Sequence, residues 1–302
     1  MSLKAENITK KYGSQKALDN VSFDIKTAEI VGFLGPNGAG KSTMMKIITG
    51  FISQNSGDVF VNELNIKDHI TEVKKQIGYL PEHNPLYYDM YVKEYLNFVA
   101  KLYSVKDYKK EVDTIIERTG LTAERNKKIG ALSKGYRQRT GLAAALIHNP
   151  EVLILDEPTT GLDPNQIIEI RNLIKEVGKE KTVMLSTHIM QEVEAICNRV
   201  IIINKGKIIA DKPVGQLTKL TQSKKQSVLM EFAEDVKIDF FNSLQKNISV
   251  YNSEGGLFIF ESNNEEDIRP ELYRFAVNQK LTILTLHQKE ESMEDIFRSL
   301  TQ

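Results

Sequence analysis

The feature that most constrains this chain is a glycine-rich segment near its N-terminus that fits the pattern G-x-x-x-x-G-K-[ST]. The segment reads Gly35-Pro36-Asn37-Gly38-Ala39-Gly40-Lys41-Ser42-Thr43. An apolar run over residues 29–34 predicts a strand before it, and residues 44–48 predict a helix after it. This context is typical of a P-loop, whose backbone N–H groups bind phosphate at a helix N-terminus. We expect all nine residues to bind a nucleotide, with Lys41 on the β- and γ-phosphates and Ser42 on Mg²⁺.

Two acidic residues follow a second apolar run. Residues 152–155 are all large and apolar, and Asp156 and Glu157 come directly after them. Such a run is typical of a strand buried on both faces of a parallel sheet. Ligands of open α/β sheets bind at the carboxyl ends of the strands. We therefore expect Asp156 to hold Mg²⁺ and Glu157 to act as the catalytic base toward water.

Residues 181–187, with Val183, Met184 and Leu185 at their centre, predict another buried strand of this sheet, which ends at His188. A single histidine is more often structural than catalytic. This one follows a strand of the same sheet as Glu157, where it can reach a phosphate, so we expect it to be catalytic together with Glu157 and Lys41. Cys197, in the helix predicted to follow, is expected to be a buried apolar residue.

A short polar segment lies ahead of the acidic strand. It reads Leu132-Ser133-Lys134-Gly135-Tyr136-Arg137-Gln138-Arg139 and precedes an apolar helix predicted over residues 142–148. Ser133 is a suitable N-cap, and N–H groups behind such a cap can bind an anion. Taken alone, the segment predicts only a capped helix. Further along, Asp163-Pro164 ends a predicted turn, because proline suits the first position of a helix.

Two groups of aromatic residues allow more than one interpretation. Tyr12 ends a predicted strand, so its ring either stacks on a nucleotide base or is an ordinary surface ring at a turn. The second group lies in a predicted loop and consists of Tyr87, Tyr88 and Tyr91. These rings either form a docking surface, since tyrosine is enriched at interfaces, or pack inside the helical region that follows.

Composition excludes several classes of protein. The chain has 302 residues, of which 41% are hydrophobic and 26% charged, as in a globular protein. Lysine plus arginine and aspartate plus glutamate both number 40, and this balance does not support nucleic-acid binding. A single cysteine allows no intrachain disulfide and indicates a reducing compartment. We find no signal peptide and no apolar run of the ~20 residues that span a membrane, so any membrane role is expected to depend on a partner.

The length and the patterns predict two domains. The first covers residues 1–218, with a helical subdomain at about 83–150 that includes helices over 92–103 and 112–121. A polar linker over 219–226 leads to an α+β domain over 227–302. Its predicted elements are strands over 227–232, 248–251, 257–261 and 281–287 and helices over 236–245, 265–278 and 292–300. This β-α-β-β-α-β order is that of a ferredoxin-like split βαβ unit. The domain carries no ligand motif; assembly or regulation is its expected role, and an inert appendage is the alternative.

Taken together and in this order, the motifs resemble those of the ATP-binding subunits of ABC transporters. The resemblance covers about residues 3–215 and rests on Tyr12, the P-loop, residues 133–138, Asp156-Glu157, Gly161-Leu162-Asp163 and His188. No other P-loop class has the Ser-x-Gly signature just ahead of the acidic strand. The resemblance implies an α/β P-loop ATPase cassette with a helical subdomain, which binds and hydrolyses ATP with Mg²⁺.

The resemblance also implies a dimer, formed by two copies or by a pair of related cassettes. Each ATP would lie between the P-loop of one subunit and the signature helix of the other. Tyr12 would stack on adenine, and His188 would contact the γ-phosphate from the P-loop side. Ser133 and Gly135 would bind the γ-phosphate across the interface, with Asp163 at the seam.

Three positions depart from the family pattern. Lys134 and Tyr136 stand where many relatives have glycine and glutamine, and Glu82 stands where most have glutamine. The resemblance implies that Glu82 lies near Mg²⁺, where a carboxylate would serve as a metal ligand. Alternatively, Glu82 points outward and pairs with a basic side chain of a partner.

Residues 79–87 are most similar to the gliding-motility type of ATP-binding subunit. That type works in exporters whose membrane subunits are separate chains. The similarity predicts a cytoplasmic protein held on the inner face of the cell membrane by integral membrane permease subunits, with no nucleic-acid partner. The alternative is a soluble ABC-type ATPase that acts as a switch on nucleic acid or ribosomes. Such proteins usually carry two cassettes or a long coiled-coil insertion, and this sequence shows neither.

Overall fold

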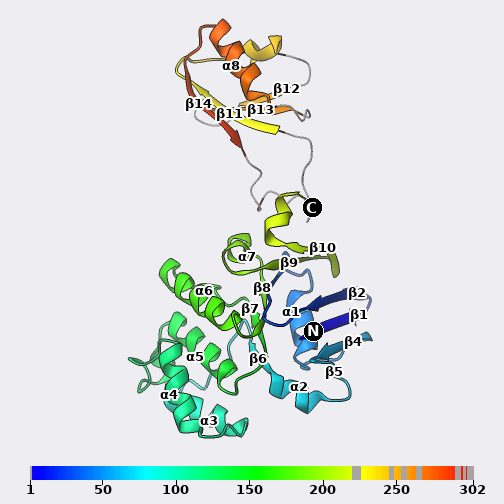
Figure 1. Ribbon diagram of the computed structural model, residues 1–302, viewed down its shortest axis with the longest axis vertical. Helices are drawn as coiled ribbons and strands as arrows, with labels where there is room; N and C mark the ends of the chain where they lie inside the picture. Colours follow the sequence, from blue (N-terminus) through cyan, green and yellow to red (C-terminus); the bar gives the residue numbers. More distant parts are fainter. Residues whose placement is uncertain are drawn as a thin grey trace. The chain divides into compact units, whose positions relative to one another are not determined.

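The computed structural model describes residues 2–219, 226–244, 248–252, 257–262, 267–289, 294 and 297. It divides into two compact units, Met1–Val214 and Gly215–Ser299, which we describe in turn (Figure 1). Most of the predicted linker and of the predicted final helix over 292–300 lies outside the described residues.

The centre of the first unit is a six-stranded sheet with the strand order β10-β9-β3-β8-β7-β6 (Figure 1). All neighbouring strands are parallel except β10, which pairs antiparallel with β9 at one edge. Strands β3, β7 and β8 are buried along their whole length, as expected for a parallel sheet covered on both faces. The strands are β3 (Ile30–Leu34), β6 (Ile77–Leu80), β7 (Val152–Asp156), β8 (Thr182–Thr187), β9 (Arg199–Asn204) and β10 (Lys207–Pro213).

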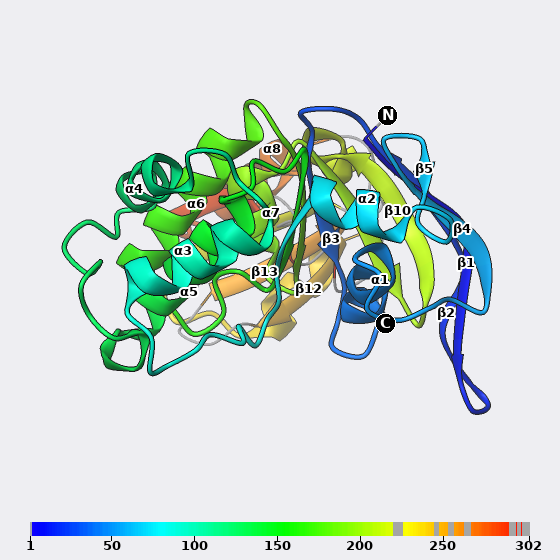
Figure 2. The ribbon, with the colours of Figure 1, turned by 90° about the horizontal axis from the view of Figure 1, so that it is seen from below.

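Successive side chains of these strands point to opposite faces, so the sheet separates two hydrophobic clusters. Leu153 and Leu155 of β7 pack with the helices of one face, whereas Val152 and Ile154 pack with α1 and a second sheet on the other. Figure 2 shows the helices α3 to α6 on one side of the central sheet and α1 with the second sheet on the other. The second sheet has the order β2-β1-β4-β5. These elements are β1 (Leu3–Tyr12), β2 (Gln15–Ile25), α1 (Lys41–Ile48), β4 (Ser56–Val61) and β5 (Leu64–Asn65).

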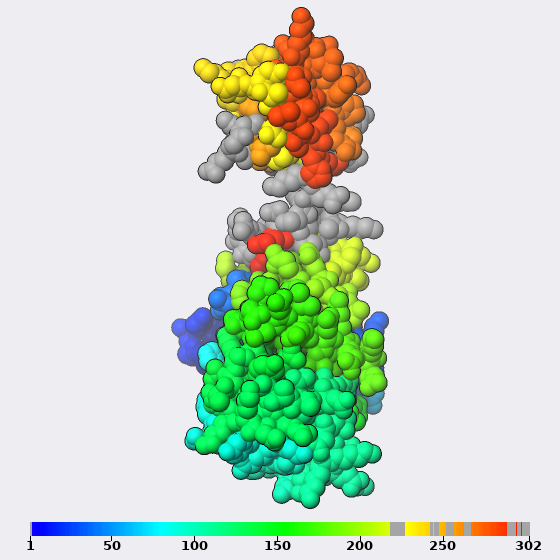
Figure 3. Space-filling view, turned by 90° about the vertical axis from the view of Figure 1, so that its left-hand side faces the viewer, coloured from blue at the N-terminus to red at the C-terminus, as the bar shows by residue number. Residues whose placement is uncertain are grey.

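The helical region between β6 and β7 contains α3 (Val92–Leu102), α4 (Tyr108–Arg118) and α5 (Lys134–Leu146), with a short 3₁₀ turn, η1, at Ile129–Ala131. In Figure 3 the middle of the chain, coloured cyan to green, covers the face of the first unit turned to the viewer. The first two helices are confirmed, but a helix that starts at residue 142 is wrong. Helix α5 starts at Lys134, because the Ser133 hydroxyl caps it by accepting the Tyr136 N–H at 3.4 Å. The signature segment is therefore the first part of the helix itself.

Three further helices flank the strands: α2 (Ile70–Gln76), α6 (Pro164–Gly178) and α7 (Met190–Ile196). Asp163 caps α6 by accepting the Gln166 N–H at 2.9 Å, and Pro164 occupies the first helical position as predicted. Cys197 lies just beyond α7 rather than inside it, and desolvation raises the pKa of its thiol. Among the described helices, none is long and apolar enough to cross a membrane.

The second unit contains an antiparallel sheet with the order β12-β13-β11-β14 and one α-helix, α8 (Arg269–Asn278). Its strands are β11 (Gln226–Phe232), β12 (Ile248–Asn252), β13 (Leu257–Ser262) and β14 (Ile283–Lys289). Strands β11 and β12 are separated by β13, as the predicted split βαβ unit requires. The α-helix predicted over 236–245 is wrong, because the structure has a 3₁₀ turn, η3, at Ile238–Ser243. This stretch is rich in aspartate, asparagine, serine and phenylalanine, which are poor helix formers.

Candidate active site

Four loops at the carboxyl edge of the central sheet form the candidate site. Strands β3, β8, β7 and β6 are neighbours, and they lead into the P-loop, His188, Asp156-Glu157 and Glu82 respectively. Side chains and backbone of these loops line one cavity of about 480 Å³. The residues around it include Asn37, Gly38, Lys41, Glu82, Glu157 and His188. Sheet topology thus brings together segments that are far apart in the sequence.

The P-loop backbone needs glycine for two separate reasons. Gly38 and Gly40 have φ angles of +79° and +111°, in the left-handed region that side chains disfavour. A Cβ on Gly40 would lie 2.6 Å from the Ala17 carbonyl oxygen, and one on Gly35 would lie 2.4 Å from that of Ile203. The loop is therefore pressed against the sheet, and its backbone leads directly into the N-terminus of α1, a position that favours anions.

Lys41, the first residue of α1, has a buried ammonium group with three partners. Its Nζ donates to the carbonyl oxygens of Gly35 at 2.7 Å and Pro36 at 3.4 Å. The same atom lies 3.6 Å from Oε1 of Glu157, and only 6% of the side chain is exposed. This cation is fixed between the P-loop and the acidic strand, where it can attract phosphate oxygens in the cavity.

Ser42 and Asp156 meet at the end of the central sheet. The Ser42 hydroxyl donates to Oδ1 of Asp156 at 3.3 Å, and the Ser186 hydroxyl donates to the same oxygen. A hydroxyl and a carboxylate are hard oxygen ligands of the kind Mg²⁺ prefers, and Mg²⁺ usually takes phosphate oxygens and water as its other ligands. The pair therefore fits the metal of a Mg²⁺–nucleotide complex. Within the described residues, no group of three His, Cys, Asp or Glu side chains is arranged to hold a metal ion.

Glu82 is placed less tightly than this pair. It lines the cavity from the loop after β6, and its side chain is exposed. In the described part of the chain, no hydrogen bond joins it to Ser42 or Asp156. Its carboxylate and that of Asp156 act on Tyr79 of β6, where burial above all, and then these two charges, raise the pKa of the phenol. The structure therefore brings Glu82 to the cavity but leaves its contact with a metal as a prediction.

Glu157 and His188 form a pair beside Lys41. Nδ1 of His188 lies 3.0 Å from each carboxylate oxygen of Glu157, and Thr160 donates to Oε2 at 3.2 Å. Glu157 has a φ of +50°, a strained conformation that concentrates at functional sites. The Glu157 N–H donates to the Ser186 carbonyl oxygen at 3.1 Å, which holds this backbone in place. The carboxylate can accept a proton from water, and the exposed imidazole can contact an anion in the cavity.

Eight predicted site residues do not line this cavity. Gly35, Pro36, Ala39 and Asp156 belong to the P-loop and to the end of β7, directly beside residues that do line it. The other four lie elsewhere in the sequence. Tyr12 is 52% exposed at the end of β1, with the Lys10 ammonium 5.3 Å from its ring centre. The other three lie at the first turns of α5 and α6 and are Ser133, Gly135 and Asp163. Gly135 is covered by Gln166, since a Cβ there would lie 2.5 Å from that side chain. Such a separation within one chain is what the dimer implied by the sequence requires.

The sequence analysis missed three residues behind the cavity: Thr159, Thr187 and Glu192. Glu192 is 1% exposed and accepts hydrogen bonds from both threonine hydroxyls. The available signal was an acidic side chain among the apolar residues Met190, Val193 and Ile196, which form the buried face of α7. An acidic side chain at such a position needs hydrogen-bonding partners.

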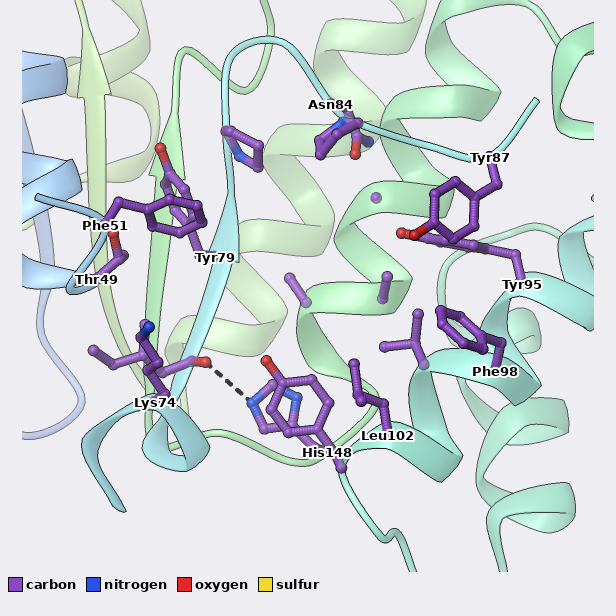
Figure 4. A pocket seen from close by; sticks show the side chains of 18 residues that line it. Thr49, Phe51, Lys74, Tyr79, Asn84, Tyr87, Tyr95, Phe98, Leu102 and His148 are labelled. Carbon is purple, nitrogen blue, oxygen red and sulfur yellow. Dashed lines mark hydrogen bonds between the residues drawn. The ribbon is translucent and has the colours of Figure 1, made fainter. Parts of the chain in front are cut away.

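A second pocket, of about 390 Å³, lies between the central sheet and the helical region (Figure 4). Its walls are mostly aromatic and include Phe51, Tyr79, Tyr87, Tyr95, Phe98 and Tyr103. The Tyr87 ring packs against Tyr95 and Phe98, with centroids 6.0 and 5.9 Å away, yet Tyr87 remains 55% exposed. Tyr88 and Tyr91 are about equally exposed, at 51% and 47%. The tyrosine loop is thus not part of the core.

The fold and the cavity define a P-loop nucleotide-binding protein. Among solved structures, the fold is similar to an ATP-binding subunit of an ABC transporter, with a TM-score of 0.67 and 27% identity over 73% of this chain and 93% of that chain. It is also similar to an ATP-binding cassette solved as a dimer in a post-hydrolysis state bound to ADP and Pi. There the TM-score is 0.65, with 27% identity over 70% of this chain and 98% of that chain.

Sequence comparison gives the particular family. The family model described as ABC transporter matches residues 18–160. The uncharacterized ABC transporter ATP-binding protein YdbJ of Bacillus subtilis is 35% identical, over 99% of this chain and 95% of its own length. The bacitracin transport ATP-binding protein BcrA of Bacillus licheniformis is also 35% identical, over 99% of this chain and 96% of its own length. The chain belongs to the ATP-binding proteins of ABC transporters and is an ATP-hydrolysing cassette of that family.

Proposed function

We propose that this protein is the ATPase subunit of an ABC exporter, in which ATP binding closes a dimer of cassettes and hydrolysis reopens it. The observation that carries the proposal is the single cavity in which the P-loop, Lys41, Glu157 and His188 meet. Export is supported by relatives that match nearly the whole chain. BcrA is named for bacitracin transport, and LnrL of Bacillus subtilis, 33% identical over 99% of this chain and 98% of its own length, is named for linearmycin resistance. The gliding-motility type suggested by residues 79–87 is a narrower form of the proposal, which the names of these relatives do not support.

The predicted site residues of the chain's own nucleotide have separate roles in this proposal. The P-loop and Lys41 bind the β- and γ-phosphates, and Tyr12 stacks on adenine. Ser42 and Asp156 hold Mg²⁺, which supplies charge neutralisation at the phosphates when it is bound. Glu157 accepts a proton from the attacking water, while His188 contacts the γ-phosphate.

The dimer and the membrane subunits are further parts of the proposal. Proteins of this family dimerise and work with membrane permeases. We assign Ser133, Gly135 and Asp163 to the nucleotide of the partner cassette, because they are grouped at two neighbouring helix starts away from the chain's own cavity. The aromatic pocket and the exposed tyrosines beside it are the proposed docking surface for integral membrane permease subunits, which would hold the cassette at the inner face of the membrane. Residues 227–302, after the linker at 219–226, would then serve assembly or regulation.

Two substitutions test the catalytic proposal. Lys41→Ala should abolish ATP hydrolysis and weaken ATP binding, since it removes the buried cation of the cavity. Glu157→Gln should preserve ATP binding, lower the hydrolysis rate by ~10²–10⁴-fold and accumulate an ATP-bound dimer. The measurements are steady-state ATPase rates, nucleotide binding and size-exclusion chromatography.

Lys46→Ala is the matched control, because Lys46 lies on the same helix with its side chain exposed. It should behave as the unmodified protein does. Full ATPase activity in a folded Lys41→Ala protein would contradict the proposal. Co-purification with ribosomes or nucleic acid instead of membrane subunits would favour the alternative of a soluble switch.

A further inference from the structure

Glu192 is a buried carboxylate whose two oxygens are bonded to two different loops of the candidate site. Its Oε1 accepts from the Thr159 hydroxyl, and its Oε2 accepts from the Thr187 hydroxyl at 2.7 Å. Glu192 is 1% exposed, Thr159 3% and Thr187 0%. The three side chains therefore form a closed unit that water does not reach.

Both threonines lie close in sequence to a proposed catalytic residue. Thr159 lies two residues after Glu157, and Thr187 lies directly before His188. The Thr187 hydroxyl also accepts the Ile189 N–H at 3.1 Å, which fixes the loop on the far side of His188. In front of this unit, His188 and Glu157 are in contact at 3.0 Å. One carboxylate thus connects the loop of the proposed base with the loop of the proposed phosphate-contacting histidine.

A carboxylate is the side chain suited to this task. Two hydroxyl donors that approach from different loops need two acceptor oxygens held in one plane, and only an ionised Asp or Glu offers them. Hydrogen bonds to an ionised acceptor are also roughly twice as strong as those between neutral groups. Burial of the charge is tolerated because both oxygens are satisfied.

We propose that Glu192 is a positioning residue for ATP hydrolysis, which holds Glu157 and His188 at their working separation. This inference rests on the proposed function, since it assumes that Glu157 is the base for water. Glu192 does not line the cavity; it acts through Thr159 and Thr187. Its removal should therefore affect the chemical step and leave nucleotide binding by the P-loop intact.

The test begins with Glu192→Ala and Glu192→Gln. In Glu192→Ala, kcat should fall by ~10–100-fold, because displacement of a catalytic group by about 1 Å has an effect of this size. The KM for ATP should stay within a factor of about three. Glu192→Gln should lose less, since its amide can still accept from one hydroxyl and donate to the other. Glu194→Gln, on the exposed face of the same helix, is the matched control and should retain full activity.

A double-mutant cycle separates positioning from general stability. Thr159→Val and Thr187→Val each remove one donor and should each lower kcat in the unmodified protein. In the Glu192→Ala background they should add little, because the link they serve is already broken. Additive losses of kcat would overturn the inference, as would a Glu192→Ala protein within twofold of unmodified kcat. If Glu192→Ala does not fold, the two valine variants combined with Glu192→Gln give the same cycle.

Measurements on Glu157→Gln distinguish a failure of this inference from a failure of the proposed function. If Glu157→Gln hydrolyses ATP as fast as the unmodified protein, the proposed role of Glu157 fails, and the inference fails with it. If Glu157→Gln is inactive while the Glu192 and threonine variants are fully active, only the inference fails. Loss of kcat in both sets, with ATP binding retained, supports both.

Discussion

At the scale of single residues, the charges around the cavity are unequal. The carboxylates of Glu82, Asp156 and Glu157 lie around or just behind it, and the buried ammonium of Lys41 lies between the P-loop and Glu157. An arriving triphosphate adds further negative charge. A divalent cation is therefore the natural counter-charge, and the number of carboxylates near it should govern how much Mg²⁺ the reaction requires.

Glu82→Gln tests this dependence. Removal of one carboxylate should raise the Mg²⁺ concentration needed for half-maximal ATPase activity, because Mg²⁺ loses an anionic oxygen. The same change should improve ATP binding in the absence of metal, because it removes repulsion of the γ-phosphate. Mg²⁺ titrations of both proteins measure the first effect, and nucleotide binding in chelator measures the second. Glu72→Gln, exposed on α2, is the control. Superimposable titrations would leave Glu82 with the docking role alone.

Residues at strand ends could be predicted from the sequence, and residues behind them could not. The P-loop, Asp156-Glu157 and His188 each follow a predicted strand, so the parallel sheet alone requires them to share an edge. Glu192 could not be found in this way, because its proposed role depends on the hydroxyls of two loops that only the folded sheet brings together. Gly135 is another example, since only the structure shows Gln166 covering it.

At the scale of elements, the His148 ring connects α5, α3 and β6. His148, labelled in Figure 4, comes directly after α5. Its ring stacks on that of Tyr103, at the end of α3, with a centroid distance of 3.9 Å. Its Nε2 donates to the Ile77 carbonyl oxygen of β6 at 3.1 Å. Its Nδ1 is buried and has no hydrogen-bond partner among the described residues. Burial, as the largest cause, lowers the pKa of His148 from 6.5 to about 4. The ring is therefore neutral in the folded protein over a range in which the unfolded chain binds a proton.

This difference predicts a loss of stability in mild acid. Between pH 6.5 and about 4 the unfolded state binds more protons at His148, so the free energy of unfolding falls as pH falls, by up to ~1.4 kcal/mol per pH unit. His148→Phe keeps an aromatic ring against Tyr103 but cannot titrate. It should cost about 1 kcal/mol at pH 7.5, from the lost hydrogen bond, and less than that or nothing at pH 5. Denaturant unfolding at several pH values measures both proteins.

The control is His69→Gln, which removes a histidine at the exposed start of α2, far from the Tyr103 ring; its unfolding is measured beside that of His148→Phe. Parallel profiles of unmodified and His148→Phe protein would contradict the prediction.

Helices and strands with a clear hydrophobic pattern could be predicted from the sequence, and those without such a pattern could not. The predicted bounds of β7, β8 and α3 match the structure closely, whereas α4 starts at Tyr108, ahead of the predicted 112–121. The start of α5 was predicted too late, because its first turns carry polar residues that a hydrophobic pattern ignores and the Ser133 cap supplies the missing signal. At Ile238–Ser243 the apolar spacing suggests a helix, but the buried Phe241 packs against the rings of Phe258 and Phe260 from a 3₁₀ turn instead.

At the scale of the whole molecule, the proposed function requires the cassette to transmit its changes to a membrane subunit. The double substitution Tyr87→Ser with Tyr88→Ser should abolish co-purification with integral membrane subunits, because it removes two half-exposed rings beside the aromatic pocket. ATPase activity of the isolated protein should be unchanged, since neither ring lines the nucleotide cavity. Ile209→Ser, at a 40% exposed position on β10 at the opposite edge of the central sheet from β6, is the control and should leave the complex intact.

The two measurements must be read together with thermal stability. A joint loss of stability, activity and complex would mean that these tyrosines serve the fold of the helical region. An intact complex in a stable double variant would place the docking surface elsewhere on the chain.

The central position of β3 in the sheet also means that the nucleotide site is completed late in the synthesis of the chain. The P-loop strand is made early, but both of its neighbours, β8 and β9, are made only after most of the first unit has left the ribosome. At ~5–20 residues per second, translation leaves this strand without its partners for on the order of ten seconds. During that interval Gly35 lacks the Ile203 backbone against which it packs in the folded protein, and the loop lacks the acidic strand that faces Lys41. We therefore expect chains that end before β7 not to bind ATP.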